Sequence, residues 1–531
     1  MNLKSYFTIF FSFLVIVIFY SCFNFFNTGN FTAFEQNTTT LIPGFKFLNT
    51  GISSDFYTQS IFYTPKKIII YLIYYSGSDW YKTTYFYKVF FVIINIPIIF
   101  ILYVSIINYW LNQCQVKINN NVLFVSIVIF LFFLANLYSF FQGDNNNLGP
   151  LGYGSIHLEK DLHAMLVSFV IGSLGSIICF NQKNFFLFKA ILLFFISTII
   201  HPAMGICNLL FFTLFYFNQI KDFLKIEFLI FLLLSLIVPL IILIFLTDNS
   251  GDLSSKEFFD IYVRERQPHH YIISNKIFLL TNYSFITWAV LLSFNLIVSY
   301  FLTNKKIFIL FFKILILFLL IPIIQFLLVE IFHSQIFIKI GITRFSTFLT
   351  LILVIQHSLL VIFFTKKFFK NDKNEKNCNI KKFILPTIVL TLIVANFTFN
   401  ETYVDPMKDP KFKKYIKITK WINENLENDN FVFFTDDQNL LPSFVRIYAN
   451  KNIFHDENMP FTKIFLKEYS ERSKQRKVIE NIFKNGNSND LLKFQDKIDY
   501  YIFSNENINN KVDLKVIYKD NFFSILQKNI N

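Results

Sequence analysis

The sequence predicts an α-helical polytopic membrane protein of about eleven membrane-spanning helices, followed by a small C-terminal α/β domain on the extracytoplasmic side. Of its 531 residues, 54% are hydrophobic and only 16% are charged, which is more apolar surface than a soluble core can bury. Apolar windows long enough to cross a hydrocarbon core of about 30 Å recur before residue 400. From about residue 401 the composition becomes that of a soluble domain.

Each predicted membrane helix corresponds to one apolar window. The first window is interpreted as a retained helix rather than a cleaved signal peptide, because it is about twenty residues long and lacks a small-residue cleavage site. The fifth and sixth windows are short and are separated only by His201 and Pro202. The predicted spans are residues 6–26, 88–111, 122–141, 162–180, 185–200, 202–218, 226–247, 277–302, 307–331, 345–364 and 383–399.

The distribution of charge predicts the orientation in the membrane. Residues 1–400 carry 28 Lys and Arg against 16 Asp and Glu, whereas residues 401–531 carry 21 against 19. The excess of positive charge therefore lies between hydrophobic windows, where it marks cytoplasmic loops, and nucleic acid is not an expected partner. The loop 365–382 alone has seven lysines against two acidic residues. We therefore expect a multi-pass protein of the plasma or inner membrane, with a cytoplasmic N-terminus and an extracytoplasmic C-terminal domain.

Two domains follow from this organisation. The transmembrane domain covers residues 1–400, with outer loops at 27–87, 142–161, 248–276 and 332–344. Residues 401–531 form the extracytoplasmic α/β domain, which is long enough for one small fold. Apolar patterning there predicts helices at 410–426 and 459–485, and strands at 431–435, 500–504, 514–518 and 522–527.

Ionisable residues gather in the predicted outer layer, which favours an outward-facing polar cavity, since such groups are costly within a bilayer unless wetted or paired. Asp55 lies in a stretch that returns toward the membrane after the first helix, where a carboxylate can act as a base or ligate a divalent metal ion. A lone loop aspartate is more often simply solvated. The five cysteines have no CxxC spacing, so neither a disulfide framework nor a zinc site is expected.

A second group of candidates carries positive charge. Arg264 and Arg266 precede the adjacent His269 and His270, and Arg344 belongs to the same outer layer. Guanidinium groups match phosphate geometry and imidazoles bind anions or shuttle protons, so these residues are candidate phosphate ligands. The alternative is ordinary loop structure. His201, in the turn before Pro202, is interpreted chiefly as part of a structural hinge and also as a candidate cavity residue.

Several of these segments together resemble one group of proteins. Asp55, the turn from His201 to Gly205, the segment from Arg266 to Tyr271, and the stretches 421–425, 446–456 and 460–472 are similar to large bacterial membrane proteins of mostly unassigned function. The layout of that group resembles the GT-C superfamily of lipid-linked-sugar glycosyltransferases. The superfamily usually has a second acidic residue two positions from the first-loop one, and this chain has none beside Asp55.

The resemblance implies sugar transfer from a polyprenyl-phosphate donor to an envelope glycan or lipid on the outer face. Asp55 would act on the acceptor hydroxyl or a metal ion, while the Arg and His candidates would hold the donor phosphate. A transporter or flippase of an envelope lipid or glycan is the main alternative, and it would carry charged residues deep within helices. His357 is almost alone in such a position. A non-catalytic envelope-assembly protein is the third interpretation.

Overall fold

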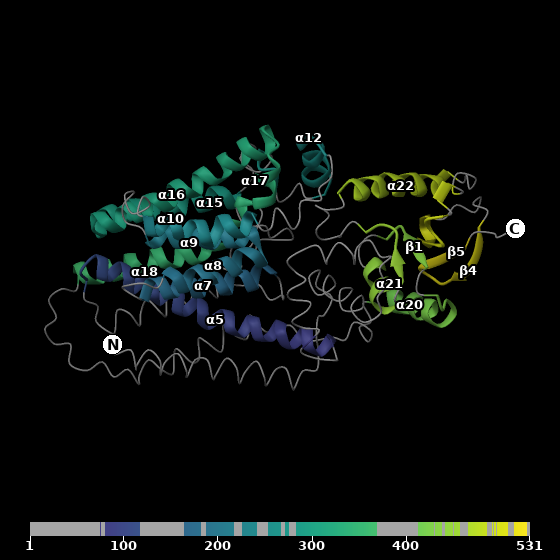
Figure 1. The fold of residues 1–531 in the computed structure, drawn as a ribbon, viewed down its shortest axis with the longest axis horizontal. Helices are drawn as coiled ribbons and strands as arrows, with labels where there is room; N and C mark the ends of the chain where they lie inside the picture. Colours follow the sequence, from purple (N-terminus) through teal and green to yellow (C-terminus); the bar gives the residue numbers. More distant parts are fainter. Residues whose placement is uncertain are drawn as a thin grey trace. The chain divides into compact units, whose positions relative to one another are not determined.

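The structure is a computed structural model, and it separates the chain into two compact units (Figure 1). The first unit comprises Met1–Thr28, Lys88–Ile244 and Val263–Glu401, and the second comprises Gly29–Tyr87, Phe245–Tyr262 and Thr402–Asn531. The structure describes residues 75, 80–116, 164–181, 187–216, 226–241, 253–266, 271–274, 283–368, 412–428, 431–437, 441–449, 451–456, 466–485, 491, 493–494, 496–507 and 514–527.

The described part of the first unit is helical. Its helices are α5 (Trp80–Gln113), α7 (Ala164–Asn181), α8 (Leu187–Ile200), α9 (Pro202–Tyr216), α10 (Ile226–Leu232), α15 (Tyr283–Leu302), α16 (Lys305–Gln325), α17 (Gln335–Ile340) and α18 (Leu349–Phe368). Short π-helices continue two of them, η3 (Leu233–Ile237) after α10 and η5 (Phe326–Ile331) after α16. The 3-10 helix η6 (Ile342–Phe348) joins α17 to α18. Helix α12 (Ser255–Phe258) belongs to the second unit, and the π-helix η4 (Phe259–Arg266) begins in the second unit and ends in the first.

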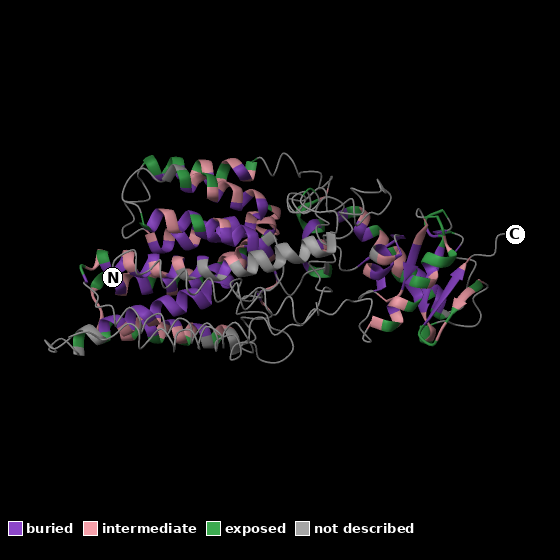
Figure 2. Ribbon diagram, turned by 90° about the horizontal axis from the view of Figure 1, so that it is seen from below, coloured by how far each residue is buried: buried purple, intermediate pink, exposed green. Residues whose placement is uncertain are grey.

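Helix α18 lies at the centre of this unit and α16 at its surface. In the most apolar 18 residues of the stretch Gln335–Phe364, 83% of the residues are buried. The corresponding share in Lys305–Ile331 is 39%. Aromatic rings from α7, α9 and η6 meet around Phe348, whose ring stacks on Phe211 at a centroid distance of 4.8 Å. Figure 2 shows buried residues on the inner helices of this unit and exposed residues on its outer helices. Helices α15 and α16 carry exposed apolar side chains. Phe294 and Ile297, each 58% exposed, are among them.

The prediction of about eleven spanning helices in a GT-C-like layout is wrong. Among the helices that the structure describes, two are long and apolar enough to cross a membrane: Lys305–Ile331 and Gln335–Phe364. Five other apolar helices have only 10–17 residues in their described parts. The two long helices indicate association with a membrane. The predicted spans at 6–26, 122–141 and 383–399 lie outside the described residues, and the span at 88–111 lies within α5.

The error has a physical cause, because hydropathy windows detect apolar composition but not helix continuity. Pro202 begins a new helix, so the windows 185–200 and 202–218 become α8 of 14 residues and α9 of 15. At 1.5 Å per residue these helices are about 21–23 Å long, which is less than the thickness of a hydrocarbon core of about 30 Å. Apolar side chains on such short helices pack against neighbouring helices instead.

Small and polar residues allow α7, α8 and α9 to pack closely. Ser168 and Ser197 exchange hydrogen bonds, each hydroxyl donating to the carbonyl oxygen of the other at 2.8 Å. The side-chain amide of Asn208 on α9 donates to the Ser168 carbonyl oxygen at 3.0 Å. A methyl group on Gly205 would overlap the Cα atom of Thr198 on α8, so only glycine fits there. These contacts fix the corner between α8 and α9, where His201 lies.

The second unit contains a five-stranded sheet in the order β2-β1-β3-β5-β4. Its strands are β1 (Val432–Thr435), β2 (Asn452–Ile453), β3 (Tyr500–Ser504), β4 (Lys515–Lys519) and β5 (Phe523–Gln527). Strand β1 runs parallel to β2 and β3, whereas β5 pairs antiparallel with both β3 and β4. Its helices are α20 (Lys413–Asn425), α21 (Leu441–Tyr448) and α22 (Leu466–Asn485).

Helices cover both faces of this sheet, as Figure 1 shows. Successive residues of a strand point to opposite faces, so neighbouring side chains enter different cores. Phe433 packs in a cluster with α20 and α21, while Phe434 packs in a cluster with α22. The strands predicted at 431–435, 500–504, 514–518 and 522–527 agree with β1, β3, β4 and β5 to within one residue. Helix α21 and strand β2 are short, and the sequence pattern did not reveal them.

We expect Gly205→Ala to lower the stability of the full-length protein. The added methyl group would force α8 and α9 apart, and overpacking of this kind typically costs about 1–3 kcal/mol. Thermal unfolding of the purified protein in detergent measures the effect. Gly175→Ala is the matched control, because the nearest atom to its new methyl group is Cε2 of the Phe194 ring at 3.1 Å, which has to give by only a few tenths of an ångström. Equal stability of the Gly205 variant and the wild type would contradict the close packing of this corner.

Candidate functional site

The structure brings together two of the predicted site residues. Arg344 Nη1 lies 2.7 Å from His201 Nε2, although 143 positions separate them in the sequence. Arg264 lies on η4 with an exposed side chain, and for Arg266 the structure describes the backbone alone. Asp55, His269 and His270 lie outside the described residues. The cluster is therefore built around the histidine of the α8–α9 corner.

The local sequence holds His201 firmly. Pro202 begins α9, a position where its missing N–H group costs nothing and its fixed φ suits a helix. Gly205 N–H donates to the His201 carbonyl oxygen at 2.9 Å, which closes the first turn of the helix. Met204 N–H donates to His201 Nδ1 at 3.1 Å. The imidazole therefore satisfies one of the backbone donors that a helix N-terminus leaves open, as shorter polar side chains commonly do.

A left-handed residue directs Arg344 toward this corner. Gly341 ends α17 with φ +58°, a conformation that glycine adopts without steric cost. The chain then turns into η6, where Arg344 N–H donates to the Gly341 carbonyl oxygen at 3.1 Å. Thr347 Oγ1 donates to the Arg344 carbonyl oxygen at 2.7 Å. The guanidinium thus projects from a short rigid segment at the start of α18.

The two contacts of His201 cannot both be satisfied by one tautomer. The Met204 N–H group needs a lone pair on Nδ1, so the proton of a neutral imidazole must lie on Nε2. Arginine has only N–H donors, so Arg344 Nη1 and His201 Nε2–H then meet donor against donor at 2.7 Å. An anionic oxygen lying beside the two groups could accept from both. The pair thus places a permanent cation beside an imidazole at a helix N-terminus, an arrangement that can bind an anion.

Three further residues surround this pair. A methyl group on Gly341 would lie 3.7 Å from Arg344 Nε, 3.8 Å from the Tyr271 hydroxyl oxygen and 3.9 Å from Ala203 Cβ. His201 is 8% exposed and Tyr271 is 1% exposed, while Arg344 is partly buried. We call His201, Ala203, Tyr271, Gly341 and Arg344 the His201–Arg344 site. Of these, sequence analysis did not single out Ala203 or Gly341, although an isolated glycine between two apolar segments is a signal for a chain reversal.

The electrostatics of the His201–Arg344 site favour an anion. The N-terminus of α9 carries the positive end of a helix dipole, which attracts negative charge. Arg344 adds a permanent positive charge, and partial burial strengthens its interaction with an anion because the local dielectric constant is low. Within the described ranges, no three His, Cys, Asp or Glu residues are close enough to hold a metal ion together.

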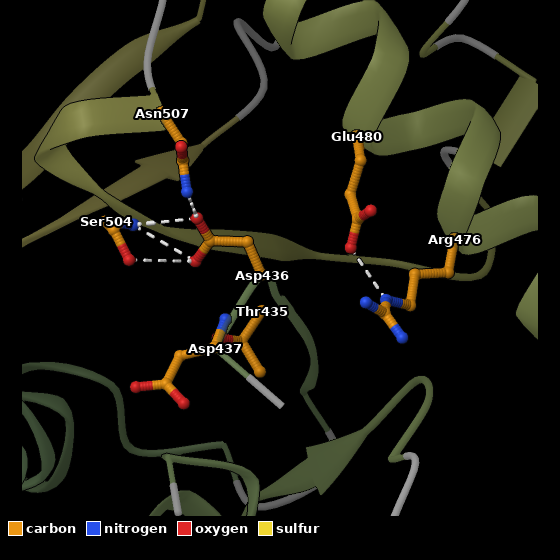
Figure 3. A network of polar contacts seen from close by, with 7 residues as sticks. All are labelled: Thr435, Asp436, Asp437, Arg476, Glu480, Ser504 and Asn507. Carbon is orange, nitrogen blue, oxygen red and sulfur yellow. Dashed lines mark hydrogen bonds and ion pairs between the residues drawn. The ribbon is translucent and has the colours of Figure 1, made fainter. Parts of the chain in front are cut away.

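The second unit has a polar network where a ligand site would be expected by topology. In open α/β sheets, ligands bind at the carboxyl ends of parallel strands where the strand order reverses, which here is the end of β1 beside β3. Asp436 lies there (Figure 3), and its carboxylate accepts from Ser504 N–H at 3.0 Å and from the Asn507 side chain at 2.7 Å. Burial raises the pKa of Asp436, and these hydrogen bonds oppose that rise. The carboxylate thus ties β1 to β3, which is a structural role.

Comparison with protein-family models, with curated proteins and with solved structures finds no match to this chain. The resemblance to the GT-C superfamily therefore stays a prediction from sequence, and the function must be argued from the His201–Arg344 site itself.

Proposed function

We propose that the protein is a membrane-bound glycosyltransferase that binds the phosphate of a polyprenyl-phosphate-linked sugar at the His201–Arg344 site. The sugar passes to an envelope glycan or lipid acceptor. One observation carries the proposal: Arg344 Nη1 lies 2.7 Å from His201 Nε2 at the N-terminus of α9, so an anionic oxygen beside the pair can accept from both groups. Asp55, which lies outside the described residues, is the proposed base that accepts the acceptor's proton.

The chemistry of sugar transfer needs such a site. When the bond between the sugar and the phosphate breaks, negative charge grows on the phosphate oxygens. Fixed donors aimed at that charge stabilise the transition state, and they act more strongly in a water-poor environment. The lipid part of the donor requires apolar surroundings, and the uncovered apolar faces of α15 and α16 offer them.

The two ends of the helical unit support an orientation in the membrane. At one end, Lys306 Nζ donates to the Gln113 carbonyl oxygen at 2.7 Å and Lys367 Nζ donates to the Phe301 carbonyl oxygen at 3.0 Å. Lys306 therefore lies at the end of α5, and Lys367, near the end of α18, lies at the end of α15. Helix α18, of 20 residues and about 30 Å, leads from the region of Arg344 to this lysine-rich end. The positive-inside rule makes the lysine-rich end cytoplasmic and the His201–Arg344 site extracytoplasmic.

Cysteine labelling in intact cells tests this orientation. In a background without the native cysteines, Phe332→Cys and Lys305→Cys place thiols at the two ends of the same apolar helix. We expect a membrane-impermeant maleimide to label position 332 in intact cells and position 305 only after permeabilisation. The exposed position of Lys477→Cys should label like position 332 if the second unit is extracytoplasmic. Equal labelling of positions 305 and 332 in intact cells would contradict a transmembrane orientation of this helix.

We expect Arg344→Gln to weaken the binding of polyprenyl monophosphate to the full-length protein in nanodiscs. A hydrogen bond to a charged group contributes about 1.5–3 kcal/mol, which corresponds to an affinity loss of roughly 10- to 150-fold. Isothermal titration measures the affinity. Lys189→Gln is the matched control, since it removes an exposed positive charge from α8 in the same unit. A loss shared by both variants would show that only the overall charge matters, and an unchanged affinity of the Arg344 variant would exclude this phosphate site.

A separate experiment tests the transfer step. Asp55→Asn keeps the size of the side chain but removes the base, so we expect sugar transfer to fall by about 10² to 10⁴ while protein abundance stays the same. Incorporation of radiolabelled sugar into envelope glycan is the measurement. Asp496→Asn, an exposed carboxylate in the second unit, is the control and should retain full activity. Full activity of the Asp55 variant with intact phosphate binding would instead favour transport of the lipid-linked sugar.

A further inference from the structure

We infer that Tyr271 is a third ligand of the anion at the His201–Arg344 site, and that Glu330 is the positioning residue that holds Tyr271 there. The inference rests on the proposed phosphate binding. It gives roles to Tyr271 and Glu330, which are not part of the contact between Arg344 and His201. Its basis is a set of hydrogen bonds between the short segment Tyr271–Ser274 and the end of α16.

The segment Tyr271–Ser274 is anchored through its backbone. Glu330 Oε1 accepts from Ile273 N–H at 2.6 Å and from Ser274 N–H at 3.1 Å. The side-chain amide of Gln325 donates to the Tyr271 carbonyl oxygen at 3.3 Å. Three contacts across more than 50 sequence positions thus fix a segment of four residues. Because a carboxylate acceptor strengthens hydrogen bonds, Glu330 contributes the strongest part of this anchor.

The π-helix η5 explains why both anchoring side chains reach the same segment. Residues five apart lie at unrelated angles on an α-helix, whereas i→i+5 hydrogen bonds bring them onto one side of a π-helix. Gln325 immediately precedes η5 and Glu330 lies five positions later within it. Phe332 N–H donates to the Leu327 carbonyl oxygen at 3.0 Å, which is a hydrogen bond of this i→i+5 type. Single-turn π-helices are frequent at functional sites, and here η5 serves to aim two side chains.

The anchor places the Tyr271 hydroxyl next to Gly341, the glycine that Arg344 Nε also approaches. Its oxygen lies 3.8 Å, and Arg344 Nε 3.7 Å, from the position that a Gly341 methyl group would occupy. The hydroxyl and the guanidinium therefore both lie close to Gly341, and we infer that an anion held by Arg344 also contacts the hydroxyl. A tyrosine hydroxyl can donate to a phosphate oxygen without adding charge. Glu330, whose Oε1 already accepts from two backbone donors, acts through Tyr271 and is not a candidate base for the reaction.

Matched variants separate these two roles. Tyr271→Phe removes only the hydroxyl group, so it should weaken polyprenyl monophosphate binding in nanodiscs by about 2- to 12-fold. It should leave hydrogen exchange of the segment 271–274 unchanged. Glu330→Ala should weaken binding and also accelerate exchange at Ile273 and Ser274. Glu330→Gln keeps the accepting oxygen and should restore most of both properties. Tyr300→Phe and Glu227→Gln, at exposed positions of α15 and α10, are the controls.

The outcomes distinguish this inference from the proposed function. If Arg344→Gln weakens binding but Tyr271→Phe does not, Tyr271 is not a ligand, and the phosphate site remains. If Glu330→Ala leaves the exchange of the segment 271–274 unchanged, Glu330 is not its anchor. A wild-type protein that does not bind polyprenyl monophosphate at all overturns both the phosphate site and the role of Tyr271. Exchange in the Glu330 variants still decides the anchoring role in that case.

Discussion

The N-terminus of α9 is the constraint on which the described site depends. Pro202 starts this helix, and His201 caps it through the hydrogen bond from Met204 N–H to Nδ1. That bond fixes the position of the ring and also its tautomer, because the remaining proton must lie on Nε2. With the proton on Nε2, the contact of Arg344 with this atom brings two N–H groups together. In that tautomer Arg344 and His201 both present N–H groups to the same point.

Breaks in helices build this arrangement. Helices α8 and α9 are two short pieces of one apolar stretch, and Gly205 allows them to pack in close contact. Gly341 ends α17 in the left-handed conformation and lets η6 carry Arg344 to the corner. The π-helix η5 interrupts the regular geometry of α16 before its end. Each break costs regular backbone hydrogen bonds. Near these breaks, the side chains of His201 and Glu330 accept hydrogen bonds from backbone N–H groups.

The second unit is held together by two hydrophobic cores on opposite faces of its sheet. Its strands alternate side chains between two separate cores, with Phe433 and Phe434 as neighbours that point to opposite faces. The charged residues there stabilise structure. Arg446 and Asp456 form a buried ion pair at 2.9 Å, and Asp436 joins the ends of β1 and β3. A buried pair of this kind is worth little as net stability, but loss of one partner is costly, so it favours one arrangement of the chain.

Features that depend on local composition can be predicted from the sequence. Short apolar runs near Phe433 and Tyr501 were sufficient to locate the central strands of the second unit, because a strand buried on both faces shows as a continuous apolar run of its own residues. The same local information indicated apolar helices and named His201 and Arg344 separately. Only the tertiary structure decided how many apolar stretches form helices long enough to span a membrane, and which candidates meet. A hydropathy window is a sum over neighbours in sequence, whereas the approach of Arg344 to His201 joins residues 143 positions apart.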